Sequence, residues 1–158
     1  MTASLTLKTL NPGEGHHFDV AGAHLAFKVR REETANAFCM FEQVLEPGEG
    51  VPMHRHSYTE AFYVLAGVLT FDTAEARGLE YGVGSTVIAR PEVRHAFRNA
   101  GTETVRLLSV AGAGHQAFFD AVEEADREQP FSAMSPQDAG ERVGRIGAAT
   151  DSRFDPPT

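Results

Sequence analysis

The segment Gly48-Glu-Gly-Val-Pro-Met-His-Arg-His-Ser-Tyr-Thr-Glu-Ala-Phe-Tyr-Val-Leu-Ala-Gly67 carries three side chains of the kinds that bind metals, His54, His56 and Glu60. Side chains alternate along an extended strand, so His54 and His56 point to the same face. Glu60 shares that face if the strand continues, although Ser57-Tyr58-Thr59 can form a bulge or a corner. The segment therefore predicts part of a metal site on a β-strand.

A third imidazole, His95, follows the turn Arg90-Pro-Glu-Val-Arg94 and begins another extended run. Three neutral imidazoles and one carboxylate suit a divalent transition metal ion, and spacing does not choose among Fe, Mn, Ni, Cu, Co and Zn. One net positive charge and open coordination positions remain in such a site, which is typical of catalytic metal centres and not of closed structural ones.

A single histidine in a β protein is more often a surface residue or a hydrogen-bonded core residue than a ligand. His16, His17, His24 and His115 are interpreted in that way, and His115 is expected near the start of a helix. Metal binding is favoured for His54, His56, Glu60 and His95 taken together, because four residues of ligand type fall at strand positions from which they can reach one ion.

Short apolar and β-branched runs separated by Gly and Pro turns predict an antiparallel sandwich or small barrel. Helical spacing of apolar residues begins after Gly114, and Ser135 is placed to cap a second short helix. The predicted organisation is an N-terminal arm at 1–19, a β domain at 20–112, a helical tail at 113–147 and a flexible C-terminus at 148–158.

The composition limits the partners. The formal net charge is −8 at pH 7 and no Lys/Arg cluster appears, which argues against nucleic acid and against an anionic membrane surface. No apolar run approaches the ~20 residues of a membrane-spanning helix, and one cysteine forms no intrachain disulfide. The N-terminal residues lack the features of a signal peptide, so a cytoplasmic protein with a small-molecule partner is expected.

The ligand segment resembles the first motif of the cupin superfamily, and a second segment resembles the other. The matching positions are Gly48, His54, His56, Glu60 and Gly67 in the first motif, and Gly84, His95 and Asn99 in the second. The second motif departs at Arg90, where the family has Pro, and at Glu92, where it has Gly. Pro91 is expected to keep the turn rigid, and a non-Gly residue at position 92 resists positive φ.

The resemblance implies a mainly β fold, a double-stranded β-helix or jelly-roll barrel with one or two short C-terminal helices. It also implies one metal ion inside the barrel on His54, His56, Glu60 and His95, and a tight turn at Gly67. Small cupins of this kind often form homodimers, so a homodimer is expected.

Strand alternation places Phe62 and Val64 on the side of Glu60, and Phe97 on the side of His95. These three residues are predicted to line a substrate pocket above the metal. They equally suit the filling of a small barrel, and both interpretations stay open.

The resemblance further implies a dioxygenase-type oxidoreductase that acts on a small aromatic or enolisable substrate, with Glu60 as both ligand and general base. Two alternatives are a non-catalytic small-molecule-binding cupin and a non-redox isomerase, cyclase or decarboxylase. Oxygen consumption and turnover distinguish the three, since one fold supports many functions.

Overall fold

The computed structural model describes residues 7–156. Its strands are β1 (His16–Val20), β2 (Ala23–Val29), β3 (Phe38–Leu45), β4 (Gly50–His56), β5 (Glu60–Ala66), β6 (Leu69–Thr73), β7 (Leu79–Tyr81), β8 (Thr86–Ala89), β9 (His95–Arg98), β10 (Val105–Gly112) and β11 (Ser152–Phe154). Its helices are α1 (Ala113–Glu128) and α2 (Pro136–Ala149), with short 3₁₀ turns at Arg31–Thr34 and Phe131–Ala133.

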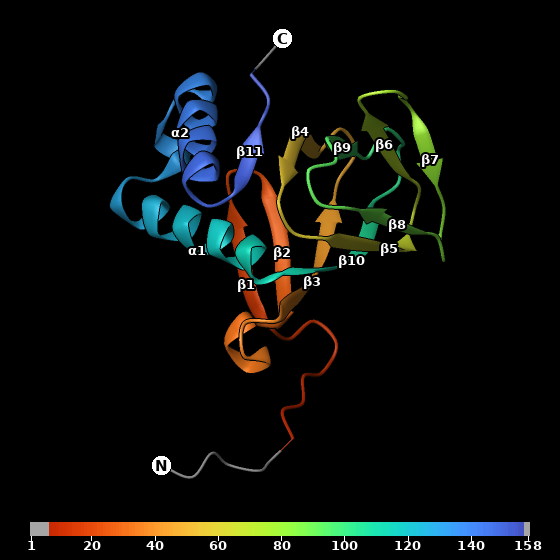
Figure 1. The fold of residues 1–158 in the computed structure, drawn as a ribbon, viewed down its shortest axis with the longest axis horizontal. Coiled ribbons are helices and arrows are strands. Elements are labelled where there is room, and N and C mark those ends of the chain that lie inside the picture. Colours follow the sequence, from red (N-terminus) through yellow and green to blue (C-terminus); the bar gives the residue numbers. More distant parts are fainter. Residues whose placement is uncertain (1–6, 157–158) are drawn as a thin grey trace.

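The strands form two antiparallel sheets that face each other (Figure 1). One sheet has the order β1-β2-β3-β10-β5-β8 and the other the order β11-β4-β9-β6-β7. Buried and exposed residues alternate along β3 and β10, as expected for strands with one face on a core and one on solvent. The predicted mainly β barrel with two C-terminal helices is confirmed.

The core consists of two apolar clusters. The first, called the barrel cluster, contains Leu45, Phe62, Val64, Leu69, Phe71, Ala89, Phe97, Val105 and Leu107. The second, called the tail cluster, contains Phe18, Leu25, Phe27, Cys39, Phe41, Ala111, Phe118, Val122 and Phe131. The tail cluster joins the helices to the sheet, so the C-terminal region is packed onto the β domain.

Helices α1 and α2 lie together beside the β1–β2 end of the sheet (Figure 1). Phe118 and Val122 of α1 are buried one turn apart, which is the face that helical spacing predicts. The predicted cap of α2 is confirmed, since the Ser135 hydroxyl accepts a 3.1 Å hydrogen bond from the Asp138 N–H. Among the described helices, none has the length and apolar character needed to cross a membrane.

Both ends of the chain differ from the sequence-based boundaries. Residues 16–19 of the predicted arm belong to β1, which pairs with β2. The predicted flexible C-terminus is wrong for residues 152–154, which form β11 along the edge of β4. β4 would otherwise present unpaired backbone groups, and β11 satisfies them while burying Ser152. Positions 157 and 158 of that predicted segment lie outside the described residues.

Gly67 makes the turn between β5 and β6 with a φ of +75°, and a Cβ there would lie 2.9 Å from the Thr104 carbonyl oxygen. We expect Gly67→Ala to lower the free energy of unfolding by about 1–3 kcal/mol, because it combines left-handed strain with this contact. Gly140 of α2 is the matched control: a Cβ there meets nothing within 4 Å, so Gly140→Ala is expected to stabilise by about 0.5–1 kcal/mol. Urea denaturation measures both, and equal effects would contradict this account of Gly67.

Candidate metal centre

Two of the predicted ligands lie on β4 and a third on β9. His54 and His56 are buried while Arg55 between them is exposed, as the strand alternation predicts. His95 is the first residue of β9 and is the direct cross-strand partner of His54. The five-stranded sheet therefore brings three imidazoles to one patch of its inner face.

Glu60 approaches the imidazoles from the other sheet. It is the first residue of β5, paired with Ala89 of β8 and Ala111 of β10. Residues 57–59 connect the end of β4 in one sheet to the start of β5 in the other. Of the two possibilities left open by the sequence, the chain therefore turns a corner here and does not continue as one strand. The carboxylate faces the histidines across the barrel.

The four donor groups converge. One ligand atom from each of His54, His56, Glu60 and His95 lies within 4.8 Å of all the others. Glu60 Oε2 is 3.3 Å from His56 Nε2 and 4.0 Å from His95 Nε2. All four residues are buried, with exposed fractions between 1% and 3%. The structure thus places the four sequence-predicted ligands around one point.

Each imidazole is oriented by a backbone carbonyl. The Nδ1 atoms of His54, His56 and His95 lie 2.9, 2.8 and 2.9 Å from the carbonyl oxygens of residues 52, 58 and 93. A carbonyl oxygen only accepts, so each Nδ1 carries the hydrogen and donates it. Each Nε2 is then left with a lone pair, which is the tautomer a metal ligand needs.

Three polar atoms at the centre, His56 Nε2, Glu60 Oε2 and His95 Nε2, are buried without a hydrogen-bond partner. Burying such atoms unpaired costs free energy, and the lone pairs of His56 and Glu60 repel each other at 3.3 Å unless a cation lies between them. A nitrogen- and oxygen-rich donor set of this kind suits a divalent transition metal. The residues present therefore fit the predicted metal.

Burial and neighbouring groups shift the pKa values of three of the four donors, His54, His95 and Glu60. Desolvation, helped by the neighbouring His95, lowers the pKa of His54 to about 3, and desolvation also lowers the pKa of His95. Burial by itself raises the pKa of Glu60, but nearby imidazoles, His115 first among them, outweigh it and lower that pKa to about 2. Neutral imidazoles beside an ionised carboxylate are the protonation states in which these side chains bind metals.

The turn before His95 tolerates the departures from the motif. Glu92 adopts a φ of +65°, the conformation that Gly would take there without strain. Its N–H donates a 2.8 Å hydrogen bond to the carbonyl oxygen of His56, which ties the turn to the ligand strand. The backbone questioned from the sequence is thus formed, at a cost of about 1–2 kcal/mol for a non-Gly residue.

The three predicted pocket residues lie in the barrel cluster. Phe62 and Val64 are fully buried and Phe97 is 4% exposed. The Phe62 ring lies 5.1 Å from the Phe97 ring and 6.1 Å from the His95 ring, measured between centroids. All three residues thus fill the core of the barrel. Of the three, Phe62 is the one whose ring contacts a predicted ligand, His95. Their role in lining a substrate pocket stays a prediction.

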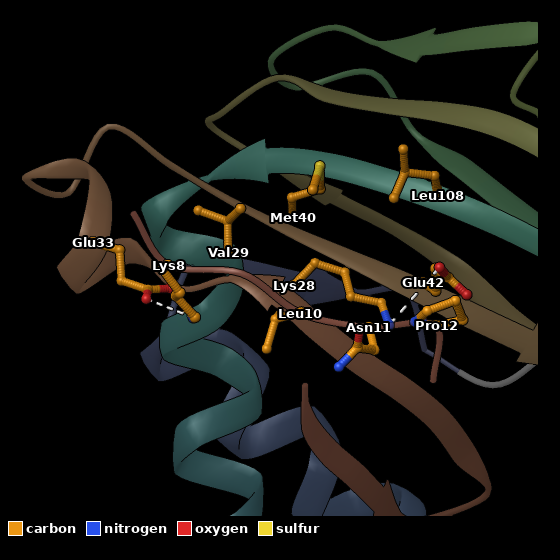
Figure 2. Close-up of a pocket in the computed structure, with 10 residues that line it drawn as sticks. All are labelled: Lys8, Leu10, Asn11, Pro12, Lys28, Val29, Glu33, Met40, Glu42 and Leu108. Atoms are coloured by element: carbon orange, nitrogen blue, oxygen red, sulfur yellow. Dashed lines mark ion pairs between the residues drawn. The ribbon is translucent and has the colours of Figure 1, made fainter. Parts of the chain in front are cut away.

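Two surface pockets lie away from the four donors. The larger is on the outer face of the six-stranded sheet, under residues 8–12, where Lys8 pairs with Glu33 and Lys28 with Glu42 (Figure 2). The other lies against β4 and β9 and is lined in part by Phe97. Neither contains one of the four predicted ligands.

Side chains other than the four predicted ligands enclose the centre. The Tyr58 ring stacks on His56 at a centroid distance of 4.2 Å. Phe154 of β11 stacks on His54 at 5.4 Å. His115 of α1, interpreted as a non-ligand near a helix start, does lie in the first turn of α1, but its Nε2 is 3.4 Å from Glu60 Oε1.

Phe154 covers His54, so we expect Phe154→Ala to speed the release of a bound metal ion to a chelator. Loss of the partly buried ring is also expected to lower the free energy of unfolding by about 1–3 kcal/mol. Stopped-flow mixing with a chromogenic chelator measures the release rate. Phe38→Ala removes an exposed ring from the start of β3 and serves as the control; equal release rates in both variants would show that Phe154 does not guard the site.

A comparison with protein-family models matches residues 41–111 to the one described as "Cupin domain". The chain carries a small cupin domain. The matched range contains all four predicted ligands and ends just before α1. The resemblance inferred from the two motifs is confirmed.

The chain is similar to several known proteins. Over 67 aligned residues it is 39% identical to "Protein SchB" of Streptomyces halstedii. The alignment covers 41% of this chain and 47% of that protein. The chain therefore spans about half the length of that relative. The fold is similar to the polyketide cyclase RemF from Streptomyces resistomycificus (TM-score 0.62, 23% identity, 68% of this chain and 80% of that one). It is also similar to a predicted oxalate decarboxylase from Thermotoga maritima (TM-score 0.56, 20% identity, 63% of this chain and 91% of that one).

Proposed function

We propose that this cupin is a metal-dependent enzyme that acts on a small organic molecule able to form an enolate. The observation that carries the proposal is the convergence of three imidazoles and one carboxylate at one point. Three of their central atoms, His56 Nε2, Glu60 Oε2 and His95 Nε2, are buried without a hydrogen-bond partner. A divalent ion bound there supplies Lewis-acid chemistry, lowering the pKa of an enol or hydroxyl group that reaches it.

The chain's own residues contribute orientation and exclusion of water. The carbonyls of residues 52, 58 and 93 hold the three imidazoles in one tautomer. Tyr58 and Phe154 close the site from the tail side, and Phe62 closes it from the barrel side. The enclosure keeps the local dielectric low, which strengthens electrostatic stabilisation of a developing negative charge.

We propose Glu60 as a ligand and not as the general base. A carboxylate whose pKa is held at about 2 is a weak base at neutral pH. Its Oε2 is also the oxygen that faces His56 and His95, so metal binding and proton abstraction would compete for the same atom. Of the two roles predicted for Glu60, ligand and general base, we therefore propose only the first.

Two reaction types fit such a substrate. In a non-redox ring closure, the enolate carbon attacks a carbonyl carbon of the same molecule, the carbonyl oxygen takes up the proton lost on forming the enolate, and no oxygen is consumed. In a dioxygenation, O2 adds to the activated carbon. The similarity to a polyketide cyclase favours the first for this chain, and the dioxygenase expected from the sequence is the second candidate because the same donor set also suits Fe, Mn, Ni and Cu.

The test begins with protein purified without chelator and without a metal-affinity step, loaded in turn with Zn, Co, Fe, Mn, Ni and Cu. Each form is incubated with poly-β-ketone, β-diketone and flavonol substrates while dissolved oxygen and product mass are followed. The proposal predicts a product of unchanged mass, or of mass lowered by water, with no oxygen uptake. The His54→Ala/His56→Ala variant is the matched control and is expected to be inactive.

The other outcomes assign the alternatives. Oxygen uptake with two oxygen atoms added to the product would establish the dioxygenase. Tight binding of a panel compound without turnover by any metal form would favour the non-catalytic binding cupin.

A further inference from the structure

His115 lies outside the matched cupin domain, in the first turn of α1, yet it reaches the centre of the site. It is 8% exposed, and its Nε2 lies 3.4 Å from Glu60 Oε1. It is not one of the four residues whose donor atoms gather within 4.8 Å, so its place is beside the carboxylate and not among the ligands.

A chain of polar contacts leads from His115 to the C-terminal strand. Its Nδ1 is 2.8 Å from the Tyr58 hydroxyl, which is 3.0 Å from the Ser152 hydroxyl. If Nδ1 carried the hydrogen, the Nε2 lone pair would face the Glu60 carboxylate and repel it. The favourable arrangement has Ser152 donating to Tyr58, Tyr58 donating to Nδ1, and the Nε2–H directed at Glu60 Oε1.

The two oxygens of Glu60 therefore have separate surroundings. Oε1 accepts a 3.2 Å hydrogen bond from Ser109 and faces the N–H of His115. Oε2 has no hydrogen-bond partner and faces His56 and His95. With Oε1 held by the protein, the rotation of the carboxylate is fixed and Oε2 alone points to the metal.

We propose that His115 is a positioning residue, supplied by the C-terminal helix, that holds Glu60 as a one-oxygen metal ligand through the Ser152–Tyr58–His115 chain. The inference rests on the metal site of the proposed function. In this proposal the C-terminal region helps to form the metal site, because α1 supplies His115 and β11 supplies Ser152.

A purely structural role for His115 makes a different prediction. Its ring stacks on Phe41 at 5.5 Å and meets the edge of Phe119 at 5.0 Å, contacts that a phenylalanine ring would preserve. Only the positioning role requires the ring nitrogens. A variant that keeps the ring and removes the nitrogens separates the two.

The experiment measures Co(II) affinity by competition with a chelator, together with the visible absorption spectrum of the Co(II) protein. His115→Phe is expected to weaken Co(II) binding about 10–100-fold and to change the spectrum, as loss of a residue that orients a ligand does. Tyr58→Phe keeps the stack on His56 and is expected to cause a smaller loss. His115→Gln restores an N–H near Glu60 and is expected to recover part of the affinity.

Phe119→Leu is the control, because it loosens the same aromatic packing while leaving the polar chain in place. Its Co(II) affinity should match that of the wild type.

Wild-type affinity and spectrum in His115→Phe would overturn the positioning role without affecting the metal site. Complete loss of Co(II) binding in His115→Phe would instead make His115 a ligand. A wild-type protein that binds no cobalt would overturn the metal site itself. If His115→Phe does not fold, His115→Gln and Tyr58→Phe carry the test: wild-type affinity and spectrum in both would equally reject the role.

Discussion

Replacing both His54 and His56 by alanine is expected to leave a folded protein that no longer retains a metal ion. The two imidazoles are half of the donor set, and both come from β4, so their loss leaves Glu60 and His95 alone at the centre. Loss of a residue that only orients a ligand lowers metal affinity about 10–100-fold. Loss of two ligands should lower the metal affinity by more than that. Elemental analysis of protein purified without chelator measures the metal content, and circular dichroism checks the fold.

The matched control removes two exposed imidazoles from another strand. His16 and His17 are adjacent on β1 and lie on the surface. His16→Ala/His17→Ala should retain the metal content of the wild type. A His54→Ala/His56→Ala protein with a full complement of metal would show that the ion is bound elsewhere.

The second large effect concerns thermal stability. A ligand present at 100 times its Kd stabilises the native state by about 2.7 kcal/mol, which for a chain of this size raises Tm by about 5–10 °C. We expect a shift of this order when the metal-free wild type is titrated with the ion it binds best. Glu60→Gln should remove the shift, because a neutral amide is a poor metal ligand and no longer balances the ion's charge.

Differential scanning calorimetry with and without the ion measures this effect. Glu80→Gln changes an exposed carboxylate on β7 in the same way and should keep the full shift. A Glu60→Gln protein that melts higher with metal by as much as the wild type would show that the carboxylate takes no part in binding.

The ligand set was predictable because it depends on local geometry. Strand alternation alone placed His54 and His56 on one face, and the motif positions added Glu60 and His95. Strand alternation does not predict that residues 57–59 cross from one sheet to the other. Whether a short polar segment continues a strand or turns a corner depends on the sheet that the next strand joins. The four ligand residues are therefore predictable from the sequence, whereas the origin of Glu60 in the opposite sheet is not.

The enclosing residues were harder to predict. Tyr58 and Phe154 contact the ligand histidines through packing between segments far apart in the chain, and no local pattern reports such contacts. His115 did leave a signal: it precedes Phe118, Phe119 and Val122 at helical spacing and so falls on the buried face of α1. The signal is weak in the sequence because His115 is one of several histidines outside the two motifs.

The C-terminal strand shows the limit of composition as a guide. A small, polar, Pro-rich stretch usually frays, and residues 148–158 have that character. The free edge of β4 overrides it by pairing with Ser152–Phe154. The homodimer, the cytoplasmic location and the dioxygenase reaction stay predictions, because they depend on partners and chemistry outside the single chain.

The most direct test of the account is a crystal structure of the metal-loaded protein, with anomalous diffraction recorded at the absorption edge of the bound ion. The account predicts one peak, about 2.0–2.2 Å from the Nε2 atoms of His54, His56 and His95 and from Oε2 of Glu60. A fully loaded protein whose anomalous peak lies away from these four atoms would contradict it.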